Sequence, residues 1–254
     1  MILKELIEIN SDAITLRKYF GEDAYSPVDI FSIISNNDNF TTVFLPMSER
    51  ISGICVRDVK NMIIAINSNV SRGRQRYTAA HELCHLFFHE DLEPVVCAMN
   101  IGQNKDPKEI EADKFASYFL APYESLKNYI KDKLVKDKGT LDITDIVKIE
   151  QYYGLSRQAI LWRLVNEGYL SHESAATMKT GVKASALKLG FDDSLYSALS
   201  KDKQYFTSGK YIKIAEELNE KDLVSTGKYN EFLLNAFRYD IVYGLNDEGE
   251  ESYD

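Results

Sequence analysis

The chain has 254 residues, of which 44% are hydrophobic and 27% charged, as is usual for a soluble globular protein with a sizeable core. The net charge of −9 argues against broad nucleic-acid binding, which requires a positive field. No apolar run reaches the roughly 18 residues that cross a bilayer, and no signal peptide is recognisable, so we expect a cytoplasmic protein without membrane contact. Three scattered cysteines exclude a disulfide framework.

The first half of the chain alternates helical and strand patterns. After two helical segments, the short runs "TTVFLP", "SGICVR" and "NMIIAIN" predict a small antiparallel sheet. The helix signal is strong over about 72–90, whereas 91–105 is expected to be irregular. A further helix follows in "DPKEIEADKFASYFLAP", with Asp106 as its N-cap and Pro107 as its first residue.

Residues 136–179 have the proportions of a helix-turn-helix, with Ser156 as the N-cap of the second helix. One interpretation is that Arg157 and Arg163 contact DNA in the major groove. The other is that the second helix packs on the rest of the protein through its apolar residues, Ile160, Leu161 and Leu164. We favour packing because the whole chain is acidic, and direct nucleic-acid binding is not expected.

The stretch "TAAHELCHLFFHE" places two histidines one helical turn apart. His81 and His85 therefore share a face of the helix, and Glu82 points about 100° to the side. The rest of the helix is mostly apolar, so the stripe is buried and its ionisable groups need partners. Two such imidazoles can bind one zinc ion, and Glu82 can reach a water that the metal activates. The alternative is a pair of core histidines with a salt-bridged glutamate.

A third zinc ligand is expected from another segment. The metzincin pattern would require glycine and histidine where this chain has Phe88 and Asp91. His89 is the local candidate, but three histidines at this spacing on one helix span about 12 Å and do not converge on one ion. We therefore place His89 behind the ligands or at the helix end.

Carboxylates of the helix after Asp106 are the better candidates. Glu109 and Asp113 share a face, so Glu109 can bind zinc while Asp113 accepts the free ring N–H of a ligand histidine. Two alternatives stay open: Asp106 and Glu109 also form a capping pattern, and Glu111 is the nearest competitor as ligand.

Together, "RQRYTAAHELCHLFFH" and "EIEADKFASYFLAP" resemble the ImmA/IrrE family of metallo-endopeptidases over about residues 25–170. Tyr77, Asp113 and Ala121 replace the family's usual Phe, Asn and Met, and none of these positions is a ligand. The resemblance implies that the zinc ligands are the residues His81, His85 and Glu109, and that Glu82 is the catalytic glutamate. The E-x-x-x-D pattern is similar to that of thermolysin-like gluzincins, which favours Glu109 over Glu111.

The resemblance also implies a function. A zinc-dependent endopeptidase of this family cleaves a partner regulatory protein, typically a helix-turn-helix repressor, and so acts as an anti-repressor for phage, mobile-element or stress genes. Two rivals are a zinc-stabilised module that binds and sequesters a regulator without cutting it, and a DNA-binding regulator. A structural zinc site would be closed by a fourth protein ligand, for which His89 or a cysteine could serve. Tyr77, Tyr118 and His172 are candidate donors to the oxyanion.

We therefore expect an α+β fold: a small antiparallel sheet packed on a zinc-peptidase helical core, then a helix-turn-helix-like region and further C-terminal helices. The expected division is a peptidase domain at 1–135, the helix-turn-helix-like region at 136–179, a C-terminal helical region of open role at 180–246, and an acidic, disordered tail at 247–254. The oligomeric state is left open.

Overall fold

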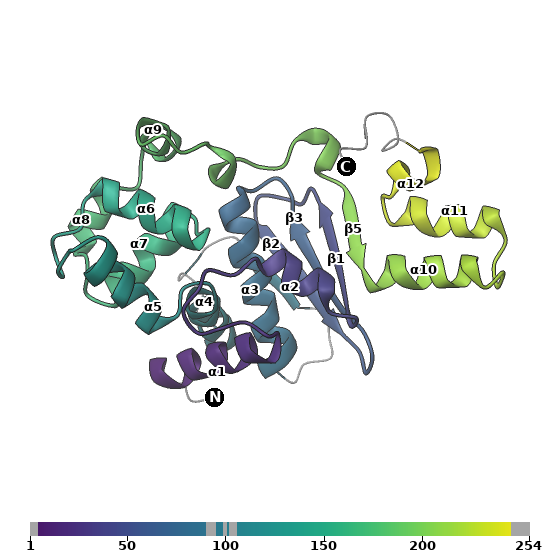
Figure 1. Cartoon of the computed structure of the whole chain (residues 1–254), viewed down its shortest axis with the longest axis horizontal. Helices are drawn as coiled ribbons and strands as arrows, with labels where there is room; N and C mark the ends of the chain where they lie inside the picture. Colours follow the sequence, from purple (N-terminus) through teal and green to yellow (C-terminus); the bar gives the residue numbers. More distant parts are fainter. Residues whose placement is uncertain (1–4, 90–94, 99–100, 102–105, 245–254) are drawn as a thin grey trace, which may run out of the picture.

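The computed structural model describes residues 5–89, 95–98, 101 and 106–244, so the expected acidic tail at 247–254 lies outside the described part. Sheet and helices form one body with a helical extension at the C-terminal side (Figure 1). The elements are α1 (Leu6–Tyr19), α2 (Ile30–Asn36), β1 (Phe40–Leu45), β2 (Ile51–Arg57), β3 (Met62–Asn67), α3 (Arg72–Phe88), β4 (Val95–Ala98), α4 (Pro107–Leu120), α5 (Tyr123–Asn128), α6 (Ile143–Tyr153), α7 (Arg157–Asn166), α8 (His172–Thr177), α9 (Val182–Lys188), β5 (Phe206–Gly209), α10 (Lys210–Glu220), α11 (Thr226–Asn235) and α12 (Tyr239–Tyr243).

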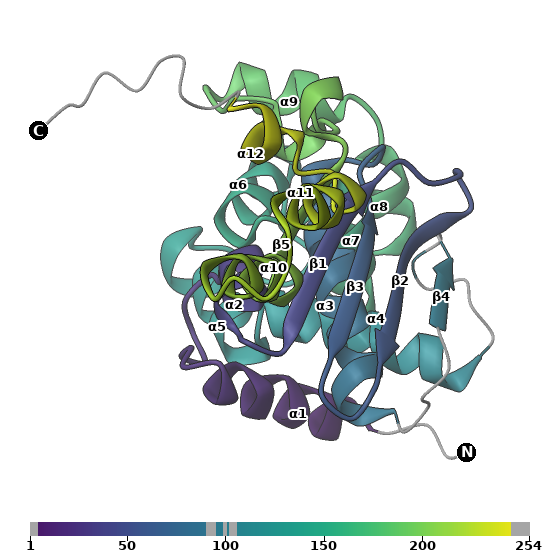
Figure 2. The same ribbon diagram turned by 90° about the vertical axis from the view of Figure 1, so that its right-hand side faces the viewer.

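The strands form a five-stranded sheet in the order β4-β2-β3-β1-β5 (Figure 2). The α+β class is confirmed, with one pairing that differs from the antiparallel expectation: β1 runs parallel to β3. β2 and β3 are joined by a tight turn, in which the Asp58 carboxylate accepts hydrogen bonds from the backbone N–H groups of Lys60 and Asn61, each at 2.7 Å. This turn folds β3 back onto β2, and β1 then takes the other edge of β3.

Two short strands were not predicted. β4 lies in the stretch expected to be irregular and pairs antiparallel with β2, and β5 lies among the expected C-terminal helices and pairs antiparallel with β1. Each has only four residues, which is too few to show an alternating pattern. Their strand conformation comes from pairing with distant segments, which local propensity does not report.

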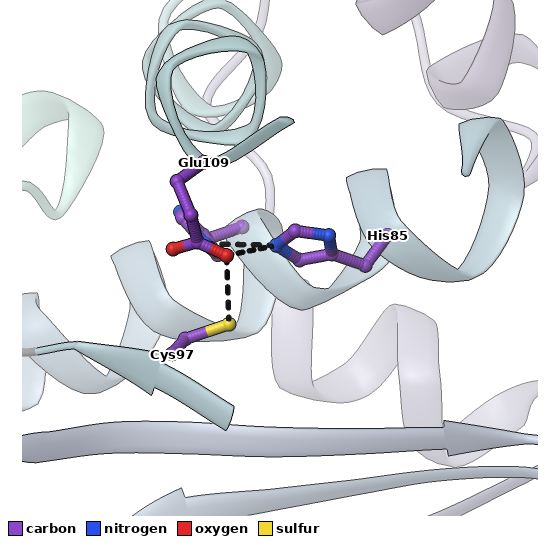
Figure 3. Close-up of side chains that lie close together, drawn as sticks. His85, Cys97 and Glu109 are labelled. Carbon is purple, nitrogen blue, oxygen red and sulfur yellow. Dashed lines mark hydrogen bonds and ion pairs between the residues drawn. The ribbon is translucent and has the colours of Figure 1, made fainter. Parts of the chain in front are cut away.

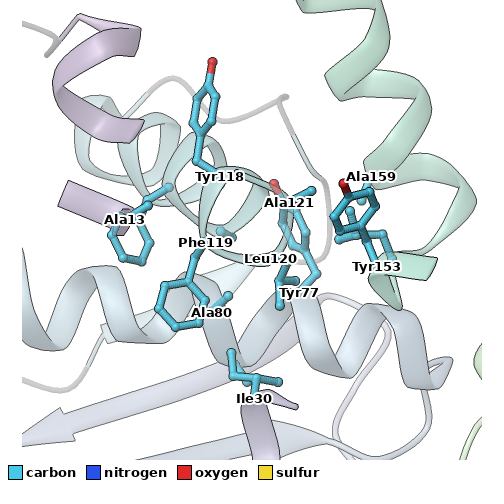
Figure 4. Close-up of a cluster of buried hydrophobic side chains, with 14 of the residues drawn as sticks. Ala13, Ile30, Tyr77, Ala80, Tyr118, Phe119, Leu120, Ala121, Tyr153 and Ala159 are labelled. Carbon is cyan, nitrogen blue, oxygen red and sulfur yellow. The ribbon is translucent and has the colours of Figure 1, made fainter. Parts of the chain in front are cut away.

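Helices cover one face of the sheet in two layers. α3 packs on β2 and β3, α4 packs on α3, and α1 packs on α4 (Figure 1). The core between them is centred on Tyr77 and Phe119, which are fully buried (Figure 4). The Tyr77 hydroxyl donates to the backbone carbonyl of Asp113 at 2.6 Å, so this bond locks α3 to α4 at the height of the histidines.

The helices α6 and α7 pack on each other, and α7 packs against α4. Ser156 caps α7 as expected, accepting from the backbone N–H of Ala159 at 3.4 Å. Both arginines of α7 are buried in ion pairs, Arg157 with Glu150 and Arg163 with Glu167. The apolar residues of the packing interpretation are also buried: Ile160, Leu161 and Leu164. Neither guanidinium is therefore displayed for contact with DNA.

The C-terminal part begins with β5, which extends the sheet beyond β1 and leads into α10. α10 packs on α11, and α11 on α12, as a helical unit beside the sheet (Figure 1). Within the described ranges, none of the helices has both the length and the apolar character required to span a bilayer.

Candidate metal centre

The two histidines of the motif lie on α3, which begins after the N-cap Ser71 and is buried along most of its length. The Nε2 atoms of His81 and His85 are 3.1 Å apart, and both side chains are buried. The helix ends at Phe88, so His89 is the C-cap and leaves the helical path. Its Nδ1 lies 2.8 Å from Nδ1 of His85, which places it behind that residue.

Glu109, on α4, extends its carboxylate to the Nε2 atoms of His81 and His85. Its Oε2 lies 3.4 Å from His81 Nε2, and its Oε1 lies 3.2 Å from His85 Nε2. Asp106 caps the helix by accepting from the backbone N–H of Lys108 at 2.9 Å, which puts Glu109 in the first turn. Burial raises the pKa of the Glu109 carboxyl, but hydrogen bonds from the two histidines hold it well below its usual range. The carboxylate is therefore ionised and bound to both imidazoles.

Glu111 occupies a different environment. Its Oε1 lies 3.8 Å from Nε2 of His89. Together with His89 and Cys84 it forms a second buried cluster of groups that are able to hold a metal. Of the two glutamates weighed as third ligand, the structure thus brings Glu109 to the His81–His85 pair and Glu111 to His89.

Asp113 lies directly behind His81, with its Oδ1 3.1 Å from His81 Nδ1. Burial lowers the pKa of His81, but hydrogen bonds with Asp113 and Glu109 outweigh it and raise that pKa to about 9. A carboxylate on Nδ1 fixes the ring and leaves Nε2 directed at the other ligand atoms. Asp113 therefore has the geometry expected of a residue that orients a metal-binding histidine.

Cys97 is a further member of this cluster; the sequence allowed a cysteine as a fourth ligand without indicating which one. Its Sγ lies 3.9 Å from Glu109 Oε1, and the ligand atoms of His81, His85, Cys97 and Glu109 all lie within 4.8 Å of one another. Figure 3 shows the Cys97 thiol pointing from β4 toward the Glu109 carboxylate, which the His85 ring approaches from another side. No local signal marks Cys97, because its place depends on the pairing of β4 with β2.

These four groups fit a transition-metal ion. With zinc–nitrogen and zinc–oxygen bonds of about 2.0–2.1 Å and zinc–sulfur bonds of about 2.3 Å, neighbouring ligand atoms of a tetrahedral site lie about 3.3–3.6 Å apart. The two Nε2 atoms are 3.1 Å apart, and Oε2 and Oε1 of Glu109 lie 3.4 Å and 3.2 Å from the Nε2 atoms of His81 and His85. The thiol lies 3.9 Å from Oε1, so binding a common ion requires it to move a few tenths of an ångström closer. The set of nitrogen, oxygen and sulfur donors is also the one that zinc prefers.

Glu82 stands beside the cluster, between α3 and β2, and is fully buried. Its Oε2 lies 3.3 Å from Cys97 Sγ, while its buried Oε1 has no hydrogen-bond partner among the described residues. Burial raises the pKa of Glu82, against the opposing effect of the two histidines. A Cβ on Gly53 would lie 2.7 Å from Oε1, so β2 approaches this closely only because residue 53 is glycine. A buried carboxylate oxygen without a donor is suited to a water molecule.

The three candidate oxyanion donors lie in other settings. The Tyr77 hydroxyl is engaged with the Asp113 carbonyl, the guanidinium of Arg163 stacks on Tyr118 at 3.7 Å, and His172 is exposed at the start of α8. Arg74 was not predicted as a site residue. It lies on α3, one turn before Thr78. Arg74 is buried and interacts electrostatically with Asp113, Cys97 and Glu82.

Comparison with known proteins agrees with this geometry. The model of the IrrE N-terminal-like domain, peptidase M78, matches residues 39–165, which is half of the chain. The matched segment runs from the start of the sheet into α7 and contains the four residues of the cluster together with Glu82 and Asp113. Among curated proteins, none matches the chain. The family match supports a hydrolase of the metallopeptidase type. The chain belongs to the family of the IrrE N-terminal-like domain, peptidase M78.

Proposed function

We propose that the protein is a zinc-dependent endopeptidase. The observation that carries the proposal is the convergence of His81 Nε2, His85 Nε2 and the Glu109 carboxylate within 3.1–3.4 Å, with the buried carboxylate of Glu82 beside them. Three protein ligands and an adjacent general base are the components of a hydrolytic zinc site. When bound, zinc supplies a Lewis acid and lowers the pKa of water.

Glu82 takes the role of general base and then general acid. Its carboxylate accepts a proton from the attacking water and delivers it to the leaving amine. Burial favours this role, because it raises the pKa of Glu82 and so makes the carboxylate a stronger base.

Two residues behind the ligands hold the imidazoles in place. Asp113 accepts from His81 Nδ1, and His89 contacts His85 Nδ1. Each contact holds an Nε2 atom toward Glu109, which is the arrangement that ligand histidines require.

The substrate is an extended peptide segment of a regulatory protein. β4 is the end strand of the sheet in the described part of the chain, so its outer edge has no strand partner there. An extended peptide adds to such an edge through backbone hydrogen bonds, beside the candidate metal centre. The resemblance to the ImmA/IrrE family favours a helix-turn-helix repressor as the partner, whose cleavage relieves repression of phage, mobile-element or stress genes.

A second candidate function is sequestration of the regulator without cleavage. The observation that favours it is Cys97, which joins the three expected ligands as a fourth donor. A site closed by four protein ligands is typical of structural zinc.

Glu82→Gln separates the two functions. The amide is nearly isosteric, so the variant should fold and bind zinc like the parent, yet lose about 10²–10⁴-fold in cleavage rate because it accepts no proton. The assay is incubation with the helix-turn-helix repressor encoded nearest to the protein, read by intact mass for a single cut. Parent and Cys97→Ala backgrounds are both used, so that the thiol does not mask activity. The exposed Glu124→Gln is the matched control.

Relief of repression in cells gives the second readout. If Glu82→Gln relieves repression as well as the parent does, cleavage is not the mechanism, and sequestration replaces it.

A further inference from the structure

We infer that Cys97 is the fourth protein ligand of the metal, and that its sulfur keeps the peptidase latent until it leaves the metal. The inference rests on the proposed function and adds the regulation of the same site. The two other cysteines of the chain, Cys55 and Cys84, provide controls for the ligand assignment.

The position of the sulfur follows from the pairing of β4. Cys97 stands opposite Gly53 of β2, and Val96 stands opposite Ile54. Side chains alternate along a strand, so the exposure of Val96 and the complete burial of Cys97 place the thiol on the face toward α3. The absence of a side chain at Gly53 leaves the space beside Glu82 that this approach requires.

The sulfur of Cys97 lies between the expected metal ligands and the general base, Glu82. It is 3.9 Å from Glu109 Oε1 on the ligand side and 3.3 Å from Glu82 Oε2 on the side of the general base. An attacking water must also contact both the metal and Glu82. The thiol and the water therefore compete for one place.

The chemistry of binding is a simple exchange. The S–H bond breaks, its proton passes to solvent, and a metal–sulfur bond forms, with no oxidation or reduction. Thiolate is among the strongest zinc ligands, and two histidines, one carboxylate and one thiolate complete a tetrahedral site. With four protein donors in place, neither water nor a scissile carbonyl has a free position on the metal.

Cobalt spectroscopy tests the ligand assignment without relying on activity. The full-length metal-free chain is titrated with Co²⁺, and absorption is recorded through the near ultraviolet and visible. A thiolate ligand adds a sulfur-to-cobalt charge-transfer band, which we expect in the parent, in Cys55→Ala and in Cys84→Ala. The band should be lost in Cys97→Ala and in Cys97→Ser, and circular dichroism verifies that each variant is folded.

The outcomes distinguish this inference from the proposed function. If the parent binds one Co²⁺ without the sulfur band, or if the band persists in Cys97→Ala, Cys97 is not a ligand and the inference fails alone. If the parent binds no Co²⁺, the metal centre fails, and the proposed function with it.

Cleavage of the repressor then tests latency. Cys97→Ala should cut faster than the parent, whereas Glu124→Gln, at an exposed position outside the site, should cut at the parent's rate. A rate for Cys97→Ala equal to or below the parent's would overturn the latency part of the inference.

Discussion

Raising the pH should destabilise the metal-free protein through a single buried histidine. The pKa of His81 is about 9 in the folded chain against an ordinary value of 6.5, because hydrogen bonds with Asp113 and Glu109 outweigh the effect of burial. The folded state therefore binds this proton more tightly than the unfolded state does. Its stabilisation is complete below about pH 6.5 and is lost as the pH rises through about 9. Each pH unit in that window is worth about 1.4 kcal/mol, so the total loss is about 3 kcal/mol.

The assay is urea denaturation with a chelator present, at about pH 6 and about pH 9.5. Asp113→Asn keeps the shape of the side chain and removes its charge, so its free energy of unfolding should fall by less than the parent's over this range. His172→Asn changes an exposed histidine and should behave like the parent. A parent stability that is constant with pH, or an equal fall in Asp113→Asn, would refute the reasoning.

Three further predictions concern the site and the helix pair behind it. Glu109→Ala should lose most bound zinc by elemental analysis, whereas Glu111→Ala should retain it; the reverse result would move the ligand role to Glu111. Gly53→Ala should lower both stability, by about 1–3 kcal/mol in denaturant unfolding, and cleavage, because the new Cβ overlaps the general base; an unchanged rate would show that β2 can withdraw. Arg157→Ala should cost about 3–5 kcal/mol by the same measurement, since it leaves Glu150 buried without its cation, and a cost below about 1 kcal/mol would contradict that account.

Local chemistry explains how much of the site could be predicted from the sequence. His81, Glu82 and His85 lie within one turn and a half of a helix, so periodicity alone gives their relative directions. Glu109 and Asp113 share a face of α4 for the same reason. Periodicity alone does not choose between Glu109 and Glu111, because the choice depends on which face of α4 meets α3.

Cys97 and the two short strands could not be predicted from local sequence patterns. β4 and β5 become strands only by pairing with β2 and β1, which lie far away in the sequence. A residue such as Cys97 therefore enters the site through the topology of the sheet. The parallel pairing of β1 with β3 has the same origin, since it joins two strands that are not consecutive in the sequence.

The pairing of β5 with β1 has a practical consequence. β1 would otherwise be the outer strand, and its register with Thr207 and Ser208 occupies its backbone groups. Gly209 completes the fit, because its φ of +89° and the nearness of the Phe40 carbonyl leave no room for a side chain. A fragment restricted to the family-matched residues 39–165 would lack this cover and expose an open edge of backbone donors and acceptors. Such fragments should aggregate. We therefore expect the C-terminal part to keep the protein soluble by covering the edge of β1.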